Sequence, residues 1–234
     1  MDKVICYVMT RNLYPKIGPS LRSLIKNSKP DRVYILCEDD VLPFRTPNVV
    51  QIINVSGQTW FRKSGPNYNS SWTWMALMKT AVSKVLTTES RVLLLDVDTL
   101  VLGNVGPLFN EKLLPMDEMC FAGAKEPHWT DVYKRLYVNA GSLVMNLDLI
   151  RQLGMDDRMI YALNNKFYMI NEQDCLNEIC KGRIMEIPSK YNATPFTDPV
   201  DEKEIVVRHY AADRGWYERP EVQAWVRKKS GGAK

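Results

Sequence analysis

The stretch that decides the fold is Val92-Leu93-Leu94-Leu95-Asp96-Val97-Asp98-Thr99-Leu100-Val101. Its short apolar start predicts a strand over residues 91–95 that is covered on both faces, as in a parallel sheet. Two carboxylates one residue apart follow the strand, and this spacing places both side chains on the same side of an extended backbone. Ligands of open α/β sheets bind beyond the carboxyl ends of strands, so this junction is a candidate site.

On either side of this stretch, short apolar runs alternate with helical stretches, which is typical of a mixed, mostly parallel α/β sheet flanked by helices. Further strands are predicted over residues 4–9, 32–37, 49–55, 121–124, 142–146, 184–187 and 205–209. Helices are predicted over residues 20–27, 74–86, 148–153, 157–164, 173–180 and 220–229. No repeat or linker divides the chain, so we expect one domain over residues 1–229 and a flexible tail over residues 230–234.

Composition excludes several classes of protein. Of the 234 residues, 45% are hydrophobic and 25% are charged, which is an ordinary globular mixture and excludes a disordered or low-complexity chain. No apolar run reaches the roughly 18 residues that a membrane-spanning helix needs. The apolar start of the chain lacks a small-residue cleavage site, so it is interpreted as a buried strand and not as a signal peptide.

The cysteines favour a reducing compartment. They are odd in number and scattered, which indicates reduced, buried thiols in a cytoplasmic protein and not a disulfide framework. A zinc cluster is not expected, because the chain has two histidines, His128 and His209, and no Cys-x-x-Cys pair. The five cysteines are Cys6, Cys37, Cys120, Cys175 and Cys180.

The net charge of +4 lies at the C-terminal end, where residues 203–234 carry eight basic and four acidic side chains. The rest of the chain is neutral and has no basic stripe, so nucleic-acid binding is not expected. Arg227-Lys228-Lys229 allows at most a weak contact with an anionic membrane surface. The alternative is a solvated helix end, where basic residues are favoured.

Asp96 and Asp98 form a candidate metal site. Two adjacent carboxylates repel each other unless a cation lies between them, and hard oxygen ligands suit Mn²⁺ or Mg²⁺. Such an ion can in turn hold a diphosphate. The Asp-x-Asp pattern also occurs as a helix cap followed by a turn residue, and that alternative stays open from these residues alone.

Three later segments bear on the choice between a metal site and a helix cap. Asn139-Ala140-Gly141 is predicted as a turn that leads into a strand and offers an amide to hydroxyl groups. Asn171-Glu172-Gln173-Asp174 opens a helix, where acidic residues also serve as ordinary first-turn residues. His209 ends a predicted strand and can be a third metal ligand or a hydrogen-bonded structural histidine.

In this order, the segments resemble the family-8 retaining glycosyltransferases. The strongest part of the resemblance is Leu95-Asp96-Val97-Asp98-Thr99-Leu100-Val101. Asn139-Ala140-Gly141 and Glu172-Gln173-Asp174 are similar to two further family blocks. The resemblance implies a GT-A fold, in which a Rossmann-like nucleotide-sugar half (residues 1–102) merges with an acceptor half (residues 103–229).

The resemblance also implies roles for individual residues. The metal ligands would be Asp96, Asp98 and His209, and the catalytic residues would be Gln173, Glu172 and Lys79. The donor would be bound by Thr10, Arg11, Asn12, Tyr14, Asp96, Val97, Asp98, Asn139, Gly141 and Arg214. The chain departs from the family pattern at Glu172, which replaces an Asp, and between His209 and Trp216, where Ala212 stands near a Gly and Arg214 would replace a Lys.

The implied activity is metal-dependent transfer of glucose or galactose from a UDP-sugar to a hydroxyl of a glycan, glycolipid or protein, with retention of anomeric configuration. Gln173 lies where a nucleophile would be needed, and an amide is a poor nucleophile, so we favour front-face substitution. The aromatic residues between Trp60 and Trp74 are candidates for sugar contact, a lid or the core. The alternatives are a non-catalytic sugar-nucleotide or glycan-binding module of the same fold, and a nucleotidyltransferase.

Overall fold

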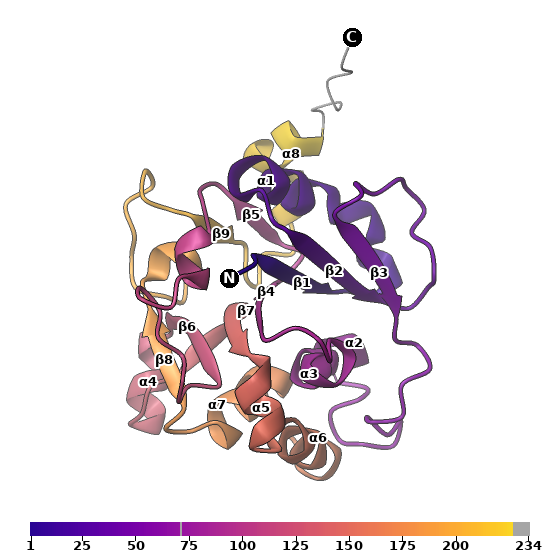
Figure 1. The fold of residues 1–234 in the computed structure, drawn as a ribbon, viewed down its shortest axis with the longest axis vertical. Helices are drawn as coiled ribbons and strands as arrows, with labels where there is room; N and C mark the ends of the chain where they lie inside the picture. The colour runs from indigo at the N-terminus through magenta and orange to yellow at the C-terminus, as the bar shows by residue number, and fades with distance from the viewer. Residues whose placement is uncertain (71, 227–234) are drawn as a thin grey trace.

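A seven-stranded sheet with the strand order β3-β2-β1-β4-β7-β6-β8 forms the centre of the protein (Figure 1). The computed structural model describes residues 1–70 and 72–226. Strand β7 runs antiparallel to both of its neighbours, and the other pairs are parallel, so the predicted mixed, mostly parallel sheet is confirmed. The strands are β1 (Val4–Val8), β2 (Arg32–Cys37), β3 (Val50–Asn54), β4 (Arg91–Leu95), β6 (Phe121–Lys125), β7 (Val138–Asn146) and β8 (Ile184–Ile187).

A small antiparallel ribbon, β5 (Thr99–Val101) with β9 (Val207–His209), lies beside the main sheet. The α-helices are α1 (Gly18–Ser28), α2 (Trp74–Leu77), α3 (Val82–Val85), α4 (Pro127–Tyr133), α5 (Leu147–Gln152), α6 (Met155–Asn165), α7 (Asn171–Ile179) and α8 (Pro220–Val226). The 3₁₀ helices are η1 (Arg11–Lys16), η2 (Met78–Ala81), η3 (Gly106–Phe109), η4 (Ser189–Tyr191) and η5 (Trp216–Glu218).

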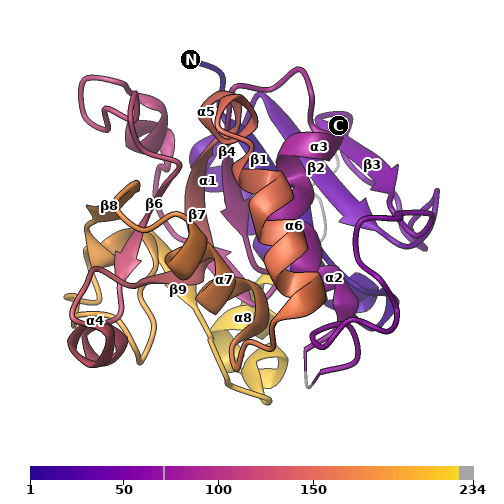
Figure 2. The same cartoon turned by 90° about the horizontal axis from the view of Figure 1, so that it is seen from below.

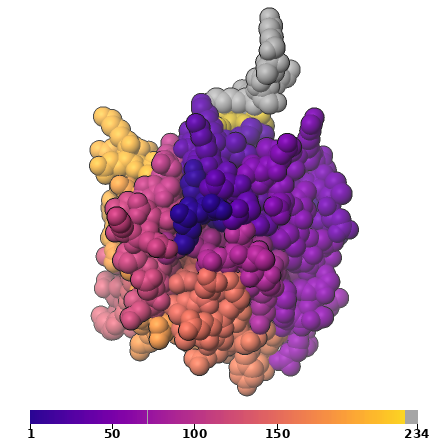
Figure 3. Space-filling view, viewed as in Figure 1, coloured from indigo at the N-terminus to yellow at the C-terminus, as the bar shows by residue number. Residues whose placement is uncertain are grey.

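The sheet is buried on both faces, as the apolar strand over residues 91–95 predicts. Successive side chains of a strand point to opposite faces, so β1 places Val4, Cys6 and Val8 in one core and Ile5 and Tyr7 in the other. Helix α1 packs against β5 and α8 on one side of the sheet, while α5 packs against β4 and α7 against β7 on the other (Figure 1). Figure 2 shows α5, α6 and α7 from that second side. Figure 3 shows that the orange segment of α5 and α6 forms one continuous surface with the purple segment of the first half.

Several element predictions need correction. Asn139-Ala140-Gly141 lies inside β7 and not in a turn before it, because buried hydrogen bonds satisfy Asn139 within the strand.

The single helix predicted over residues 74–86 is divided into α2, η2 and α3. Strand β5 and helix α4 were not predicted, since both are short and local periodicity is weak over so few residues. The predicted helix over residues 220–229 is described as far as Val226, and the basic residues and tail beyond it lie outside the described residues.

All five cysteines are free and buried, as predicted. Within residues 1–70 and 72–226, none of the helices has the length and hydropathy needed to cross a bilayer.

Candidate active site

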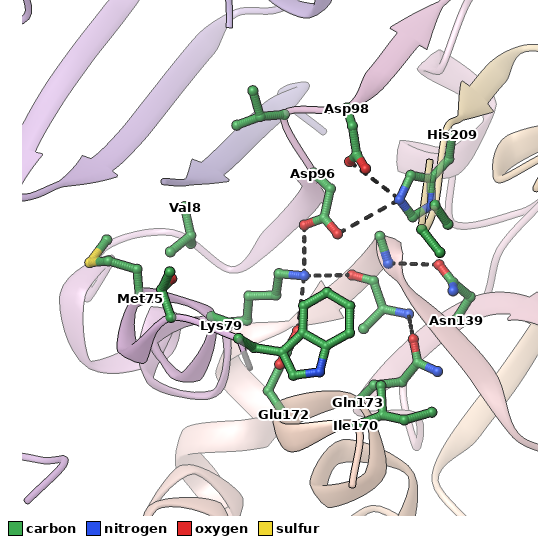
Figure 4. Close-up of a pocket in the computed structure, with 18 of the residues that line it drawn as sticks. Val8, Met75, Lys79, Asp96, Asp98, Asn139, Ile170, Glu172, Gln173 and His209 are labelled. Carbon is green, nitrogen blue, oxygen red and sulfur yellow. Dashed lines mark hydrogen bonds and ion pairs between the residues drawn. The ribbon is translucent and has the colours of Figure 1, made fainter. Parts of the chain in front are cut away.

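A cavity of about 500 Å³ opens where the carboxyl ends of β1, β4 and β6 meet the start of β7. Because β1, β4 and β6 run in one direction, the residues that follow them share one edge of the sheet. Figure 4 shows that the labelled polar side chains converge there. The predicted site residues that line the cavity are Thr10, Asn12, Lys79, Asp96, Val97, Asp98, Asn139, Gly141, Glu172, Gln173 and His209.

Three of them form a candidate metal centre. Asp96 follows β4 directly, and the pairing of β5 with β9 sets His209 opposite Thr99 and so beside Asp98. His209 Nε2 lies 3.4 Å from an Asp98 carboxylate oxygen and 3.8 Å from an Asp96 oxygen. One ligand atom from each residue lies within 4.8 Å of the others, and two carboxylates with an imidazole suit a divalent cation such as Mn²⁺.

The electrostatics of this group follow from burial and mutual attraction. Burial disfavours the charged carboxylate of Asp98, but the charge and hydrogen bond of His209 outweigh it and lower the pKa of Asp98. Burial likewise disfavours the imidazolium, but Asp98 and then Asp96 raise the pKa of His209. The two carboxylates therefore favour a positive charge beside them, which either a proton on the imidazole or a bound cation would supply.

Gly141 makes room for the imidazole. A Cβ atom built on Gly141 would lie 2.0 Å from His209 Cε1, closer than any real contact allows. Gly141 O also accepts a hydrogen bond of 2.9 Å from Asp96 N, which joins β7 to the acidic strand end. The glycine is thus needed for close approach of β7 to His209, a different reason from the donor contact that the family resemblance implies.

Lys79 forms the ionic centre of the cavity. It lies on η2, and its Nζ is 2.6 Å from Asp96 Oδ1 and 3.1 Å from Glu172 Oε1. Burial opposes the charged ammonium group, but the two carboxylates raise the pKa of Lys79. Burial also raises the pKa of Glu172, although Lys79 opposes that shift. A buried lysine between two carboxylates is positioned to meet an anionic ligand that enters the cavity.

A second set of polar groups holds Gln173. Its Oε1 accepts from Ala140 N at 2.9 Å, and its Nε2 donates to Tyr137 Oη at 3.2 Å and to Glu126 Oε1 at 3.3 Å. Asn139 Nδ2 donates to the same Glu126 oxygen at 2.5 Å. The amide of Gln173 therefore has partners at both ends and a fixed orientation.

Glu126 is a cavity residue that the sequence reasoning missed. It is 4% exposed, and burial raises the pKa of its carboxyl, although hydrogen bonds from Asn139 and Gln173 oppose that shift. It follows β6 as Asp96 follows β4, so the argument from strand ends could have found it. The sequence does not show the direction in which β6 runs, because the reversal at β7 that makes β6 parallel to β4 is not visible in it.

The end of the cavity beside β1 includes only part of the set predicted to bind the nucleotide. Thr10 and Asn12 line it, whereas Arg11 and Tyr14 do not. Arg11 Nε is paired with Asp39 at 2.7 Å, and Tyr14 Oη donates to the same carboxylate at 2.9 Å. Through these contacts with Asp39, Arg11 and Tyr14 connect η1 to the loop after β2.

The segment between His209 and Trp216 includes Ala212, which stands near a Gly of the family pattern. Ala212 lines the cavity with φ of 62°, a left-handed conformation that favours glycine. Trp216 lines the cavity and is 7% exposed. Arg214 is exposed and is not among the residues that line the cavity.

Exposed aromatic rings lie at the cavity. Trp72 is 49% exposed and Phe196 is 47% exposed, and both line it together with Trp129. Trp129 stacks on Tyr133 with ring centroids 5.7 Å apart. Of the aromatic residues predicted for sugar contact, Trp72 reaches the cavity, Phe61 lies in the core, and the partly buried Trp60, Tyr68 and Trp74 pack against the core.

The sequence is similar to known glycosyltransferases. Residues 4–214 match the family described as "Glycosyl transferase family 8". A protein of Haemophilus influenzae (strain ATCC 51907 / DSM 11121 / KW20 / Rd) with the name "Putative glycosyltransferase" is 24% identical over 159 residues. The match covers 59% of this chain and 47% of that protein, so the chain spans about half the length of this curated relative.

Solved structures show a similar fold. The galactosyltransferase LgtC, in complex with donor and acceptor sugar analogues, has a TM-score of 0.70 at 15% identity, covering 99% of this chain and 98% of LgtC. The bifunctional glycosyltransferase WbbM has a TM-score of 0.73 at 13% identity, covering 98% of this chain and 50% of WbbM. GlyE of Streptococcus pneumoniae TIGR4 has a TM-score of 0.71 at 17% identity, covering 97% of this chain and 59% of GlyE. At these identities the likeness establishes the fold, which is GT-A-like as predicted.

Proposed function

The chain belongs to glycosyltransferase family 8, and on that premise we propose that it is a metal-dependent, retaining hexosyltransferase that uses UDP-glucose or UDP-galactose. The observation that carries the proposal is the convergence of Asp96, Asp98 and His209 with Lys79 and Gln173 in one cavity. Two carboxylates, an imidazole and a buried lysine suit a cation together with a diphosphate.

Asp96, Asp98 and His209 would hold Mn²⁺ or Mg²⁺, which would supply Lewis-acid stabilisation of charge on the diphosphate. Lys79 would exchange part of its pairing with Asp96 and Glu172 for the same diphosphate, because its ammonium group already lies between them. Thr10, Asn12 and Val97 would contact the nucleoside. The nucleotide-sugar half would thus extend over residues 1–102 and the acceptor half over residues 103–229.

Retention would follow from front-face substitution. The amide oxygen of Gln173 is engaged by Ala140 N, which supports a role in stabilising the positive charge of the sugar over one as nucleophile. The leaving phosphate would take the proton of the acceptor hydroxyl as the new glycosidic bond forms and the bond to UDP breaks. Glu172 and Glu126 are carboxylates that line the cavity with Gln173 and could instead attack. Asn139 would contact the donor sugar.

The acceptor would be a glycan, glycolipid or protein whose sugar or side chain stacks on the aromatic rings that line the cavity. We expect Trp129→Ala to raise the acceptor KM about 2- to 10-fold, as expected for a lost aromatic contact of about 0.5–1.5 kcal/mol. The change should leave acceptor-free donor hydrolysis near normal. Tyr161→Ala, which removes an aromatic ring that is 71% exposed and outside the cavity lining, is the control. An unchanged acceptor KM in Trp129→Ala would exclude stacking at this ring.

The compartment and the membrane contact also remain proposals. Five free, buried thiols suit the cytoplasm. The basic residues 227–229, the basis for weak membrane contact, lie outside the described residues. Roles for Arg11, Tyr14 and Arg214 in donor binding stay predictions, and each would require movement of a side chain toward the cavity.

A non-catalytic donor-binding module is the second candidate. The position of Arg214 outside the cavity lining favours it, because the leaving diphosphate would then lack one expected cation. Release of UDP from UDP-glucose and UDP-galactose with Mn²⁺ separates the two. The enzyme should release UDP with one donor and stop on chelation, whereas a module would bind the donor without releasing UDP.

A further inference from the structure

A line of hydrogen bonds connects the backbone of β7 to the imidazole of His209 through two buried amides. Gly141 N donates to Asn139 Oδ1 at 2.9 Å, and Asn192 Nδ2 donates to the same oxygen at 2.9 Å. Asn192 Oδ1 lies 3.0 Å from His209 Nδ1. Asn192 is 0% exposed, so water does not compete for these contacts.

The direction of every bond in this line is determined by its first member. The backbone N–H of Gly141 can only donate, so the Asn139 atom that it meets must be the oxygen. The Asn192 atom that meets this oxygen must then be the amide nitrogen, which leaves the Asn192 oxygen facing His209. An amide oxygen can only accept, so His209 Nδ1 must carry the proton.

We propose that Asn192 is a positioning residue that holds His209 as the Nδ1–H tautomer and aims its Nε2 lone pair at the space shared with Asp96 and Asp98. A metal ligand of this kind needs an unprotonated nitrogen, and a partner on the other ring nitrogen fixes both tautomer and ring orientation. The inference rests on the metal-dependent function proposed above.

The same line continues to the amide proposed for catalysis. Asn139 Nδ2 donates to Glu126, and Gln173 Nε2 donates to the same Glu126 oxygen. One buried chain of contacts therefore orients both the imidazole of His209 and the amide of Gln173. Asn192 lies in the segment that connects η4 to β9. It contacts His209 although the two residues are 17 positions apart, so sequence spacing does not reveal the contact.

The tautomer can be measured on the unaltered protein. Two-bond ¹H–¹⁵N correlations of ¹⁵N-histidine-labelled protein with Mg²⁺ and UDP report which ring nitrogen carries the proton. The chain has two histidines, and His128→Gln assigns the His209 signals. We expect a proton on Nδ1 and none on Nε2. A proton on Nε2 with Nδ1 bare would overturn the role of Asn192.

Substitution gives a second readout. Asn192→Leu should weaken Mn²⁺ binding, measured by titration calorimetry, about 10- to 100-fold. Asn192→Asp keeps an oxygen toward His209, so its affinity should stay closer to the unaltered protein and its Nδ1–H signal should persist. Asn67→Leu is the matched control, since Asn67 is also 0% exposed but bonds the backbone of Leu163 and Lys166.

The outcomes separate this inference from the proposed function. Mn²⁺ affinity in a folded Asn192→Leu protein equal to that of the Asn67→Leu control would reject the inference and leave the metal site intact. Absence of Mn²⁺ binding by the unaltered protein would reject the proposed function itself. If Asn192→Leu does not fold, the tautomer of the unaltered protein and the Asn192→Asp affinity still decide the question.

Discussion

The cavity has two sides whose polar atoms are satisfied in different ways. We call Lys79, Asp96, Asp98, Glu172 and His209 the ionic cluster, and Glu126, Asn139, Gln173 and Asn192 the amide cluster. In the ionic cluster, Lys79 pairs with two carboxylates at 2.6 and 3.1 Å and His209 lies 3.4 and 3.8 Å from two carboxylates, and a charged ligand can replace such partners. In the amide cluster, the amide groups have directional partners that fix their orientation. The comparison indicates that one side binds charge while the other maintains geometry.

The largest effect should come from the ionic cluster. Asp98→Asn keeps the shape of the side chain but removes a carboxylate from the candidate metal centre. We expect loss of Mn²⁺-dependent UDP binding and a fall in turnover on the order of 10³-fold, measured by calorimetry and UDP release. Unchanged Mn²⁺-dependent affinity would remove Asp98 from the metal site.

The amide cluster should respond differently. Gln173→Ala removes an oriented amide without changing charge, so turnover should fall on the order of 10²-fold while UDP affinity stays near normal. Single-turnover kinetics together with UDP titration measure both. A parallel loss of UDP affinity would mean that the two clusters do not divide binding from geometry.

A pH dependence of stability tests the buried carboxylate of the amide cluster. Burial raises the pKa of Glu126 above its ordinary value of 4.5, so the folded protein retains a proton that the unfolded chain has lost. The ionisation of buried Glu126 therefore lowers the free energy of unfolding as the pH rises from 4.5 through the raised pKa. In urea unfolding, the free energy of unfolding of Glu126→Gln relative to the unaltered protein should increase with pH.

Glu89→Gln is the control of opposite sign. The hydrogen bond from Arg32 outweighs burial and lowers the pKa of Glu89, so its contribution is present above about pH 4.5 and is lost as pH falls through the lowered pKa. The relative stability of this variant should decrease as pH rises. The same direction of change in both variants would contradict the assignment for Glu126.

The smallest effect is expected beside the ionic cluster, at Ala212. Its φ of 62° costs a residue with a side chain about 1–2 kcal/mol, part of which glycine recovers. Ala212→Gly should stabilise the protein by up to about 1 kcal/mol in thermal or urea unfolding. Destabilisation would show that the loop does not hold this conformation in solution.

The sequence predicted the sheet better than the site, for physical reasons. Strands such as Arg91–Leu95 and Ile184–Ile187 were placed correctly because short apolar runs between polar residues define them locally. Asp96 and Asp98 could be proposed as ligands because two carboxylates directly follow a buried strand, although the backbone at Val97 and Asp98 is a turn and not the extended chain that the spacing argument assumed. The place of His209 at a strand end allowed either a metal ligand or a structural histidine, and only the family resemblance favoured the ligand, since the approach of His209 to Asp98 depends on the β5–β9 ribbon.

Other features depend on contacts across the fold and were not predictable. Glu126 and Asn192 became visible through hydrogen bonds that cross long stretches of sequence, to Gln173 and His209 respectively. Asn139 was placed in a turn because an amide before a glycine is typical of one. Two of its partners, Glu126 and Asn192, come from other segments, and only the folded chain brings them together to satisfy an amide inside a strand.

The most direct test of the central claim is the position of manganese in crystals grown with Mn²⁺ and UDP, located by its anomalous scattering. We predict a peak within coordination distance of Asp96, Asp98 and His209 Nε2, with the diphosphate on its open side near Lys79. A peak away from these three residues, or His209 turned from the ion, would contradict the metal-dependent mechanism.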